Sequence, residues 1–552
     1  MASEAEIETA SPDKPIIQME PLTLDEVKKP RTRLRTIAIL TALYLAVFIS
    51  ALDQTIMATS IPTISAQLHS ASGYVWIGSA YLLANAAAGP VWAKCSDIWG
   101  RKPALLGAVV LFAGASIMGA LSVSMNMLIA ARALQGTAGG GLLQLVFITI
   151  SDLFSMRERV LYLGLTEVLW AIAGGIGPLI GGAFTQLVTW RWCFWVNLPI
   201  CVGTTFILLF CFLDVHNPRT GFSEGLAAID WFGTLSILGV IIMLLLGLDF
   251  GGAVFPWSSP TVICLIVFGI VMIGVFLFSE KKLAKYPLIP LAMFKDPSNL
   301  AIFVIGATQG ICYIPAEYYL PLYFQSAKQA SPLRSGVLIL PITVCEGAFG
   351  ILSGVIMHQT GRYREVMWAG VFLILIGTGL YISIGADSSI PKLVGFMIIG
   401  GSGCGLLFEA PVIAIQNTVS QADTATATAA FGMIRNIATS ISIVLGGVIF
   451  QNSMAGQAER LQRASLDPTV VEALTNGQAA ANVEIIGTIE NVVQRDVVRY
   501  AFASSFRNMW IMYTCIAAVG LIAGAFIKQG HLSKEHTETR TGIQEMTERV
   551  KK

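Results

Sequence analysis

Opposite charges on two apolar segments are the first residues in this sequence whose types suggest chemistry. Asp53 lies near the end of the apolar run 36–58, and Arg132 lies near the start of the run 127–150. If the first run enters a bilayer from the inside, Asp53 lies ~26 Å along that helix and Arg132 ~8 Å below the outer edge. A lone charge in hydrocarbon costs several kcal/mol and normally faces a partner or water. We therefore expect Asp53 either to pair with Arg132 or to exchange a proton, with a fixed structural pair as the alternative.

Charged residues recur in the other apolar segments. A carboxyl group in such surroundings can carry a proton near neutral pH. For each single residue, a hydrogen-bonded structural group is the alternative. Glu317 lies about as far along its segment as Asp53 does, and Glu346 is a further acid of this kind. The candidates for proton coupling are Asp53, Arg132, Glu167, Glu317, Glu409 and Arg435.

Aromatic side chains lie on the same segments as these acids. Contact with lipid, or a place in the interfacial belt, is the default for such residues. Those on the same segments as the buried acids are instead candidates for an apolar substrate cavity. The predicted cavity residues are Gln135, Trp170, Tyr313, Tyr318, Glu346 and Phe408.

Signatures of catalysis and of nucleotide binding are absent from the sequence. It contains no GxxxxGK[ST], HExxH or GxSxG motif, and the nine cysteines include no CxxC pair. The stretch GGSGCG at 400–405 has no strand before it and is interpreted as packing glycines. We expect no enzyme activity, no metal, no cofactor and no ATP, so that transport would draw on an ion gradient or on the gradient of the substrate.

Composition places the chain in a membrane. Hydrophobic residues make up 55% of it and charged residues only 12%, whereas soluble domains carry about 25% charged residues. The net charge of +1 gives no field that would attract nucleic acid. The expected partners are therefore the lipid bilayer, a small-molecule substrate and protons.

Fourteen apolar segments are long enough to cross a bilayer, which takes roughly 20 residues each. We therefore predict an all-α membrane protein with 14 transmembrane helices. The segments run near 36–58, 74–93, 103–123, 127–150, 160–184, 192–213, 229–250, 260–280, 298–323, 333–356, 365–385, 391–418, 425–450 and 505–528.

Basic residues predict the orientation of these spans. Lysines and arginines gather before the first span and after the second, fourth, eighth and tenth, and are sparse in the opposite short loops. The positive-inside rule therefore places both termini in the cytoplasm. The first 35 residues are polar, so we expect no cleaved signal peptide and the first span to act as the signal.

One loop on the outer side is long, at about 451–504. Its stretches TVVEAL and TIENVVQRDVVRYAF are interpreted as short amphipathic helices on the outer face. The chain also repeats itself, because AKCSDIWGRK closes the second span and GVIMHQTGRYR closes the tenth. Two six-helix halves with the seventh and eighth spans inserted between them would explain this, and repeated halves are a transporter architecture.

Motifs in order along the chain resemble the major facilitator superfamily. SDIWGRK, IAARALQGTAGGG and GGIGPLIGG resemble its three signature motifs. LDQTIMATSIP and WRWCFWVNLP resemble its fourteen-spanner drug:proton antiporter branch. YYLPLYFQ followed by ASPLRSGVLILP resembles the fungal drug and toxin efflux members. The resemblance covers about residues 36–528 and implies the major-facilitator fold of two six-helix bundles plus two inserted central helices.

Roles follow from this resemblance by position. Arg132, Gln135 and Gly136 would belong to the proton-coupling helix, and Asp53 would be the first-span acid. Ala93 and Ile98 depart from the usual gating motif, His358 stands where the second half would repeat Asp97, and Glu409 replaces an expected neutral residue. The gating turn would be Asp97, Gly100, Arg101 and Lys102, and the antiporter motif would be Gly177, Pro178, Gly181 and Gly182.

The domains that this interpretation predicts divide the chain into five parts. They are a cytoplasmic tail 1–35, a six-helix bundle 36–214, inserted spans 215–297, a second bundle 298–528 that includes the outer loop 451–504, and a cytoplasmic tail 529–552.

The function predicted is proton-coupled efflux of amphipathic or hydrophobic small molecules, such as drugs, fungal toxins or secondary metabolites. One alternative is an importer of siderophore-iron or basic amino acids on the same scaffold. A second alternative, of another functional class, is a non-transporting membrane receptor. The plasma membrane is the expected location, with the vacuolar membrane as the alternative.

Overall fold

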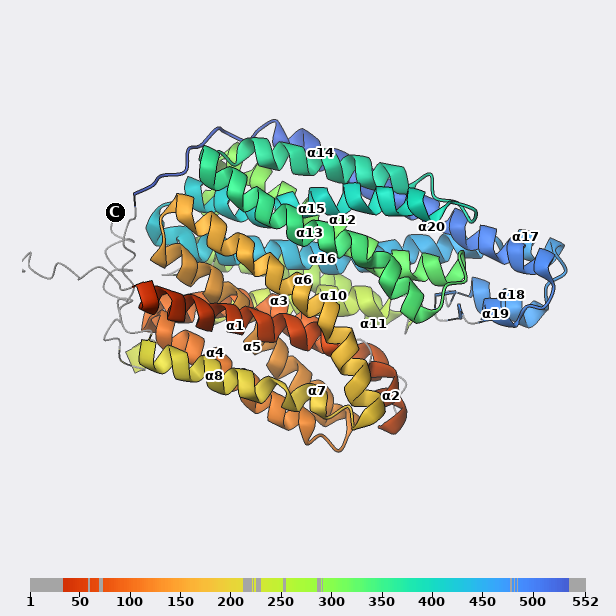
Figure 1. Ribbon diagram of the computed structural model, residues 1–552, viewed down its shortest axis with the longest axis horizontal. Helices are drawn as coiled ribbons and strands as arrows, with labels where there is room; N and C mark the ends of the chain where they lie inside the picture. Colours follow the sequence, from red (N-terminus) through yellow and green to blue (C-terminus); the bar gives the residue numbers. More distant parts are fainter. Residues whose placement is uncertain are drawn as a thin grey trace, which may run out of the picture.

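The protein is built from helices that run along one common direction (Figure 1). A computed structural model describes residues 33–57, 60–68, 73–211, 221, 223–224, 230–251, 255–284, 289, 291–476, 479–480, 482–483 and 485–535. Most of the predicted N-terminal tail and most of the predicted C-terminal tail lie outside these residues, and residues 33–35 belong to the first helix. Within them, the only β-structure is an isolated bridge between Gly251 and Phe255.

The first half of the chain forms one bundle. The long helices α1 and α6 pack together, as do α3 and α5, while α4 packs on α5 and α8 packs on both α1 and α4. Its helices are α1 (Arg33–Met57), α2 (Ile61–Gln67), α3 (Gly73–Trp99), α4 (Arg101–Ala120), α5 (Met125–Leu153), α6 (Met156–Leu187), α7 (Trp192–Trp195) and α8 (Asn197–Cys211).

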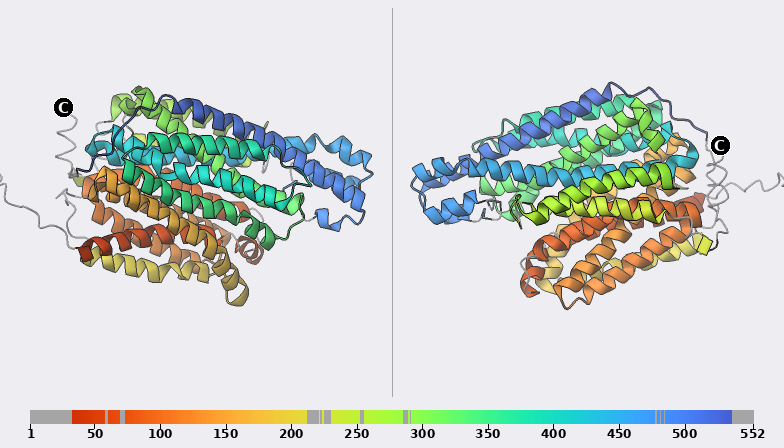
Figure 2. Two further views of the ribbon diagram at one scale, coloured as in Figure 1. Left: turned by 45° about the horizontal axis from the view of Figure 1, so that its top comes forward. Right: turned by 180° about the vertical axis from the view of Figure 1, so that it is seen from behind.

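The second half forms a matching bundle, and two helices lie between the bundles. α10 (Trp231–Phe250) and α11 (Pro260–Phe278) pack on each other, and α10 also contacts α3 and α16, one from each half (Figure 2). The long helices of the second bundle are α12 (Pro297–Ser326), α13 (Pro332–Thr360), α14 (Arg364–Tyr381), α15 (Ile390–Thr418), α16 (Thr424–Ala455) and α20 (Val492–Gly524).

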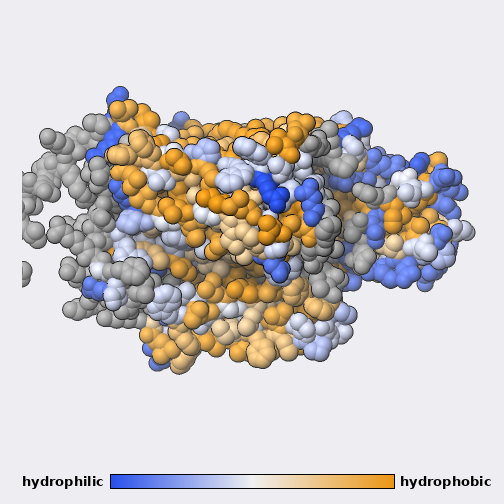
Figure 3. Space-filling model, turned by 90° about the horizontal axis from the view of Figure 1, so that it is seen from below, coloured by the Kyte–Doolittle hydropathy of each residue, from blue (hydrophilic) through white to orange (hydrophobic). Residues whose placement is uncertain are grey.

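The predicted spans agree with these helices, with one difference in number. Among the described residues, 13 helices are long and apolar enough to cross a membrane, and each matches a predicted segment. The segment 74–93 is α3, a 27-residue helix whose apolar character is diluted by Asn85 and Pro90. Apolar side chains such as Phe206, Phe268 and Phe372 are exposed on the body, and Figure 3 shows a broad hydrophobic surface there.

The long loop between α16 and α20 folds into short helices beyond the body. They are α17 (Ala458–Arg463), α18 (Pro468–Thr475) and α19 (Ile485–Thr488), and α18 holds the stretch TVVEAL. The second predicted amphipathic helix is wrong in its extent, because residues 492–502 are the first turns of α20. No glycine or proline occurs between residues 492 and 519, so nothing ends the helix before it enters the span.

Glycines allow two pairs of helices to pack closely, one pair in each bundle. A Cβ on Gly136 or Gly140 of α5 would lie 2.1 or 2.4 Å from a backbone oxygen of α3, at Tyr81 and Asn85. Gly401 and Gly405 of α15 meet α13 in the same way, at 2.7 and 2.5 Å from the backbone oxygens. Small residues four apart let two helix backbones approach in lipid. The chain repeat is thus visible as the same contact in each half, and two glycines of GGSGCG serve it.

Candidate functional site

The acid and base singled out in the first half form a buried ion pair. Arg132 Nη1 of α5 lies 2.5 Å from Asp53 Oδ2 of α1. The other carboxylate oxygen accepts hydrogen bonds from Gln135 Nε2 at 3.1 Å and Asn197 Nδ2 at 2.9 Å. All four side chains are at most 2% exposed. Since every bond to Asp53 is donated to it, the carboxylate acts only as an acceptor here.

Further contacts hold Arg132 in place. Its Nε donates to the Ile77 carbonyl at 3.2 Å, and its guanidinium lies 4.5 Å from the centre of the Tyr81 ring. Ser116 of α4 accepts from Gln135 at 2.9 Å and from Asn197 at 3.4 Å. Gln135, predicted as a cavity residue, therefore lies inside this network.

Asn197 is a member of the network that the sequence did not reveal. It is the first residue of α8 and fully buried. The only signal was an amide side chain at the start of an apolar run, in the motif WRWCFWVNLP.

Most of the other predicted charges converge at the middle of the molecule, between the halves. Glu167 of α6 and Glu409 of α15 have interacting carboxyl groups although they belong to different bundles. Thr166 Oγ1 lies 3.5 Å from Glu409 Oε1 across the same interface. Arg435 of α16 interacts electrostatically with both acids. Its guanidinium also lies 4.8 Å from the ring centre of Phe408 and 3.4 Å from the Phe408 carbonyl oxygen.

Tyr313 of α12 connects this group to the remaining acids. Its side chain interacts with the carboxyls of Glu317 and Glu346, and its ring meets the Phe408 ring edge to face at 6.0 Å. The structure thus brings together Glu167, Glu317, Glu346, Glu409, Arg435, Tyr313 and Phe408. Asp53 and Arg132 lie apart from them, within the first bundle.

Several polar atoms of this central group have no protein partner. Glu167 Oε1, Glu346 Oε1 and Glu409 Oε2 are buried without a hydrogen bond. A buried carboxyl oxygen without a partner is costly unless water or a ligand supplies one. The centre of the molecule is therefore arranged to bind a proton, water or a polar group of a ligand.

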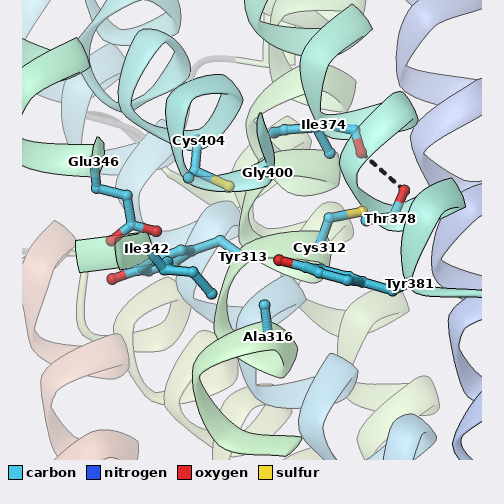
Figure 4. Close-up of a pocket in the computed structure, with 11 residues that line it drawn as sticks. Cys312, Tyr313, Ala316, Ile342, Glu346, Ile374, Thr378, Tyr381, Gly400 and Cys404 are labelled. Carbon is cyan, nitrogen blue, oxygen red and sulfur yellow. Dashed lines mark hydrogen bonds between the residues drawn. The ribbon is translucent and has the colours of Figure 1, made fainter. Parts of the chain in front are cut away.

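A small cavity adjoins Glu346 inside the second bundle (Figure 4). It lies among α12, α13, α14 and α15, with room for about one water molecule. Figure 4 shows the Tyr381 hydroxyl directed into it, and that hydroxyl has no hydrogen bond. The lining residues include Cys312, Tyr313, Ile342, Glu346, Thr378, Tyr381, Gly400 and Cys404.

Trp170 and Tyr318, the remaining predicted cavity residues, lie near the group but are not in the contacts described for it. Trp170 is half-buried and packs against apolar residues of α1 and α6. Tyr318 is 59% exposed, and its ring meets Tyr319 at 5.0 Å between ring centres.

The predicted gating turn is held by Arg101. Its guanidinium donates at 2.6 Å to Asp97 and, with another nitrogen, at 2.6 Å to Asp152 at the end of α5. Gly100 has φ +96°, a conformation that favours glycine. Lys102 is outside the cluster and donates to the Leu209 carbonyl at 3.0 Å.

The predicted antiporter motif lies on α6, where only part of it makes a close contact. A Cβ on Gly177 would lie 2.1 Å from Thr55 Oγ1 of α1, and that hydroxyl donates to the Ala173 carbonyl at 2.9 Å. Gly182 has nothing within 4 Å of such an atom. Pro178 is half-buried and Gly181 is buried within the same helix.

Hydrogen bonds between the two bundles begin at one end, the end that carries α1's first residue and the last described residue. Arg159 Nη1 donates to Gln416 Oε1 at 3.0 Å, and Gln421 Nε2 donates to the Ser151 carbonyl at 3.3 Å. Every hydrogen bond that the structure describes between the bundles involves residues 151–167 of the first one. Further along, α6 and α13 are still in contact, because a Cβ on Gly174 would lie 3.8 Å from Thr343 Cγ2, whereas one on Gly175 or Gly336 would meet nothing within 4 Å. The hydrogen bonds between the bundles thus run from one end to the middle of the molecule, and we call that end the closed end.

Comparisons with known proteins agree with this architecture. Residues 43–230 and 223–443 match the family model of the Major Facilitator Superfamily. The "Efflux pump dotC" of Dothistroma septosporum strain NZE10 is 46% identical over 506 residues, which cover 92% of this chain and 86% of the relative. The "MFS-type efflux pump LUC4" of Fusarium sp is 32% identical over 548 residues, covering 98% and 96%.

Solved structures share the fold at low sequence identity. The human organic anion transporter MFSD10 matches with a TM-score of 0.57 at 15% identity, over 88% of this chain and 99% of that one. The proton:xylose symporter XylE matches with a TM-score of 0.56 at 13% identity, over 90% and 97%.

Proposed function

The chain belongs to the major facilitator superfamily and is a transporter rather than an enzyme, and from this premise we propose that it exports amphipathic or hydrophobic small molecules in exchange for protons. Drugs, fungal toxins and secondary metabolites are the proposed cargo. Relatives named as efflux pumps support the outward direction. The observation that carries the proton coupling is the meeting of Glu167 and Glu409 across the two bundles.

This pair can link protonation to conformation. Two carboxylates that face each other repel, and a proton held between them removes that repulsion. Because one acid belongs to each bundle, a protonated pair stabilises the arrangement in which the bundles are in contact, and its ionisation favours their separation. Two ligands that bias one equilibrium are coupled reciprocally. Arg435, next to both acids, would compete for the same charges.

The other predicted residues have proposed roles around this pair. Glu317, Glu346 and Tyr313 would form the wall that meets cargo, with Phe408 as its apolar surface. Asp53 and Arg132 would hold the second proton-sensitive site, within the first bundle. Arg101 with Asp97 and Asp152, and the contact of Gly177 in α6 with α1, would control the movement of the two bundles relative to each other.

Location and domain boundaries stand as proposals beside this function. We propose the plasma membrane, with cytoplasmic termini and domain limits at 36–214, 215–297 and 298–528; the vacuolar membrane is the alternative. An importer on the same scaffold is the alternative direction, and the sign of cargo flux under an imposed proton gradient separates the two.

A transport assay with Glu409→Gln tests the coupling. In reconstituted liposomes, a cargo chosen from a panel of hydrophobic drugs and toxins should be moved faster by the wild type when a proton gradient is imposed. The variant removes the charge but keeps the shape, so this stimulation should fall by about 5- to 150-fold, the usual range of a coupling of 1–3 kcal/mol.

A matched control is Glu459→Gln in α17, whose side chain is 82% exposed and which should behave as the wild type. If Glu409→Gln responded to the gradient as strongly as the wild type, the proposed coupling role would be wrong.

A further inference from the structure

The chain after α20 continues as an irregular segment toward the closed end of the molecule (Figure 1). We call residues 526–535 the tail strap. Ile527 and Leu532 are 2% and 4% exposed, so the segment is packed into the protein at two points. Because exposed termini seldom bury such side chains, the packing indicates a specific docking surface.

The strap is anchored on the second bundle by both backbone and side chain. Lys528 N donates to Ser298 Oγ at 3.0 Å, and Lys528 Nζ lies 3.0 Å from Asp296. The amide of Ser298 and the Lys528 ammonium lower the pKa of the Asp296 carboxyl, so this anchor is charged at neutral pH. Leu532 N donates to the Gly361 carbonyl at 2.9 Å.

The docking surface is shaped to receive this segment. Gly361 ends α13 with φ +71°, which turns its carbonyl toward the strap. Gly530 lies so close to the second bundle that a Cβ there would be 2.5 Å from the Tyr363 hydroxyl and 2.6 Å from Asn417 Nδ2.

The strap then reaches the first bundle. Arg157 N, an amide in the first turn of α6, donates to the Ser533 carbonyl at 3.1 Å. Amides in the first turn of a helix have no partner within that helix. Ser533 therefore supplies a bond that the first bundle cannot make for itself.

Arg157 is also one of the α6 residues that contact α13. Its guanidinium donates to the carbonyls of His358 and Gln359, at the end of α13. The His358 ring nitrogen Nδ1 lies 2.9 Å from the Arg157 carbonyl oxygen. The strap thus joins a junction that must come apart whenever this end of the molecule opens.

We propose that the tail strap is a built-in peptide ligand of the Gly361 turn, which fastens the two bundles together at this end and releases Arg157 when the end opens. This rests on the alternating access of the proposed function. Most of its contacts stay within the second bundle, so the strap would remain docked there while the first bundle swings away. A single net hydrogen bond of about 1 kcal/mol corresponds to a change of about fivefold in the open population.

Labelling of a buried cysteine can measure that population. Ser151 is fully buried at the closed end of α5, and its carbonyl accepts from Gln421 of the other bundle. Ser151→Cys changes one atom and should react with a maleimide only when this end opens. Mass spectrometry of the peptide that holds residue 151 separates its labelling from that of the native cysteines.

Two pairs of variants of the Ser151→Cys protein form the test. A chain that ends at Ala525 and the full chain with Leu532→Asp should each be labelled about fivefold faster. A chain that ends at Glu535, and the full chain with Gln529→Ala, should be labelled as the parent is, because the Gln529 side chain is exposed and donates its hydrogen bond to Glu365 of the same bundle. A peptide of residues 526–535, added to the chain that ends at Ala525, should slow labelling again.

Equal labelling rates in all four variants would show that the tail strap does not fasten the two bundles together. The full-length Leu532→Asp protein decides the question if the shortened chain does not fold. Labelling needs neither cargo nor a proton gradient, so this result would leave the Glu409→Gln transport test unaffected, and a failed transport test would leave the strap standing.

Discussion

Asp53 combines full burial with a complete set of donors. Arg132, Gln135 and Asn197 all donate to its carboxylate. Gln135 and Asn197 each donate a second hydrogen bond to the Ser116 hydroxyl. A buried charge of this kind is tolerable only with its partner, and removing one partner typically costs 3–5 kcal/mol. The ion pair therefore stabilises the first bundle, as well as being a candidate for coupling.

A paired substitution separates these two roles. Asp53→Asn and Arg132→Ala should each abolish drug efflux while the protein still reaches the membrane. Asp53→Asn combined with Arg132→Gln removes both charges, so the melting temperature should recover because no unpaired charge remains, whereas efflux should stay lost.

Growth on a toxic cargo and a thermal melt of the purified protein measure the two outcomes. Arg463→Ala, at a position 80% exposed, is the control for loss of an arginine. Normal resistance in cells with the doubly substituted protein would show that the charges serve structure alone.

The acids of the second bundle occupy positions that carry amides in the first. The backbone of Glu346 contacts Gly405 in the second bundle, just as the backbone of Asn85 contacts Gly140 in the first. Four residues after each of these glycines come Glu409 and Gln144. The repeat therefore kept the helix contacts and changed the titratable groups, which places the acid-rich side of the central site on the second bundle.

At the scale of elements, glycine contacts determine how deeply helices can pack. Gly136 has a backbone oxygen of α3 where a Cβ would go, and backbone cannot move aside cheaply. Gly114 in α4 has nothing within 4 Å of that position. The same substitution should thus have opposite signs at the two sites.

Gly136→Ala should destabilise the protein by about 1–3 kcal/mol through overpacking. Gly114→Ala should stabilise it by up to about 1 kcal/mol, because alanine is the better helix former. Thermal unfolding in detergent measures both. A Gly136→Ala protein as stable as the wild type would mean that α3 and α5 are not in this close contact.

At the scale of the whole molecule, closure at one end is the feature with the clearest consequence. α6 and α13 are in backbone contact near that end, since a Cβ on Gly354 would lie 3.8 Å from Leu161 Cα. An alternating carrier must open there once in each cycle. A covalent link between the helices should therefore stop transport.

Leu161→Cys with Gly354→Cys provides such a link. After oxidation the doubly substituted protein should lose transport, and a reductant should restore it, while each single cysteine variant should transport in both conditions. Cargo flux in liposomes with and without reductant measures this. Full transport by the oxidised protein would show that this end does not open.

Hydropathy and charge along the chain were enough to predict most of the architecture. The apolar runs locate the helices, because a bilayer sets their length, and the repeated turn motifs indicate two halves. The pairing of Asp53 with Arg132 could also be expected, since two lone charges at one depth cost less together. These features depend on local composition and on distance along a helix.

Only the tertiary structure decided which side chains meet. Glu167 and Glu409 are far apart in sequence, and their contact depends on how α6 and α15 are rotated and how the bundles lean together. Asn197, the onset of α20 and the docked tail strap depend likewise on packing that no single segment encodes. The sequence thus determined that charges would be buried, and the packing of helices on glycine contacts determined their partners.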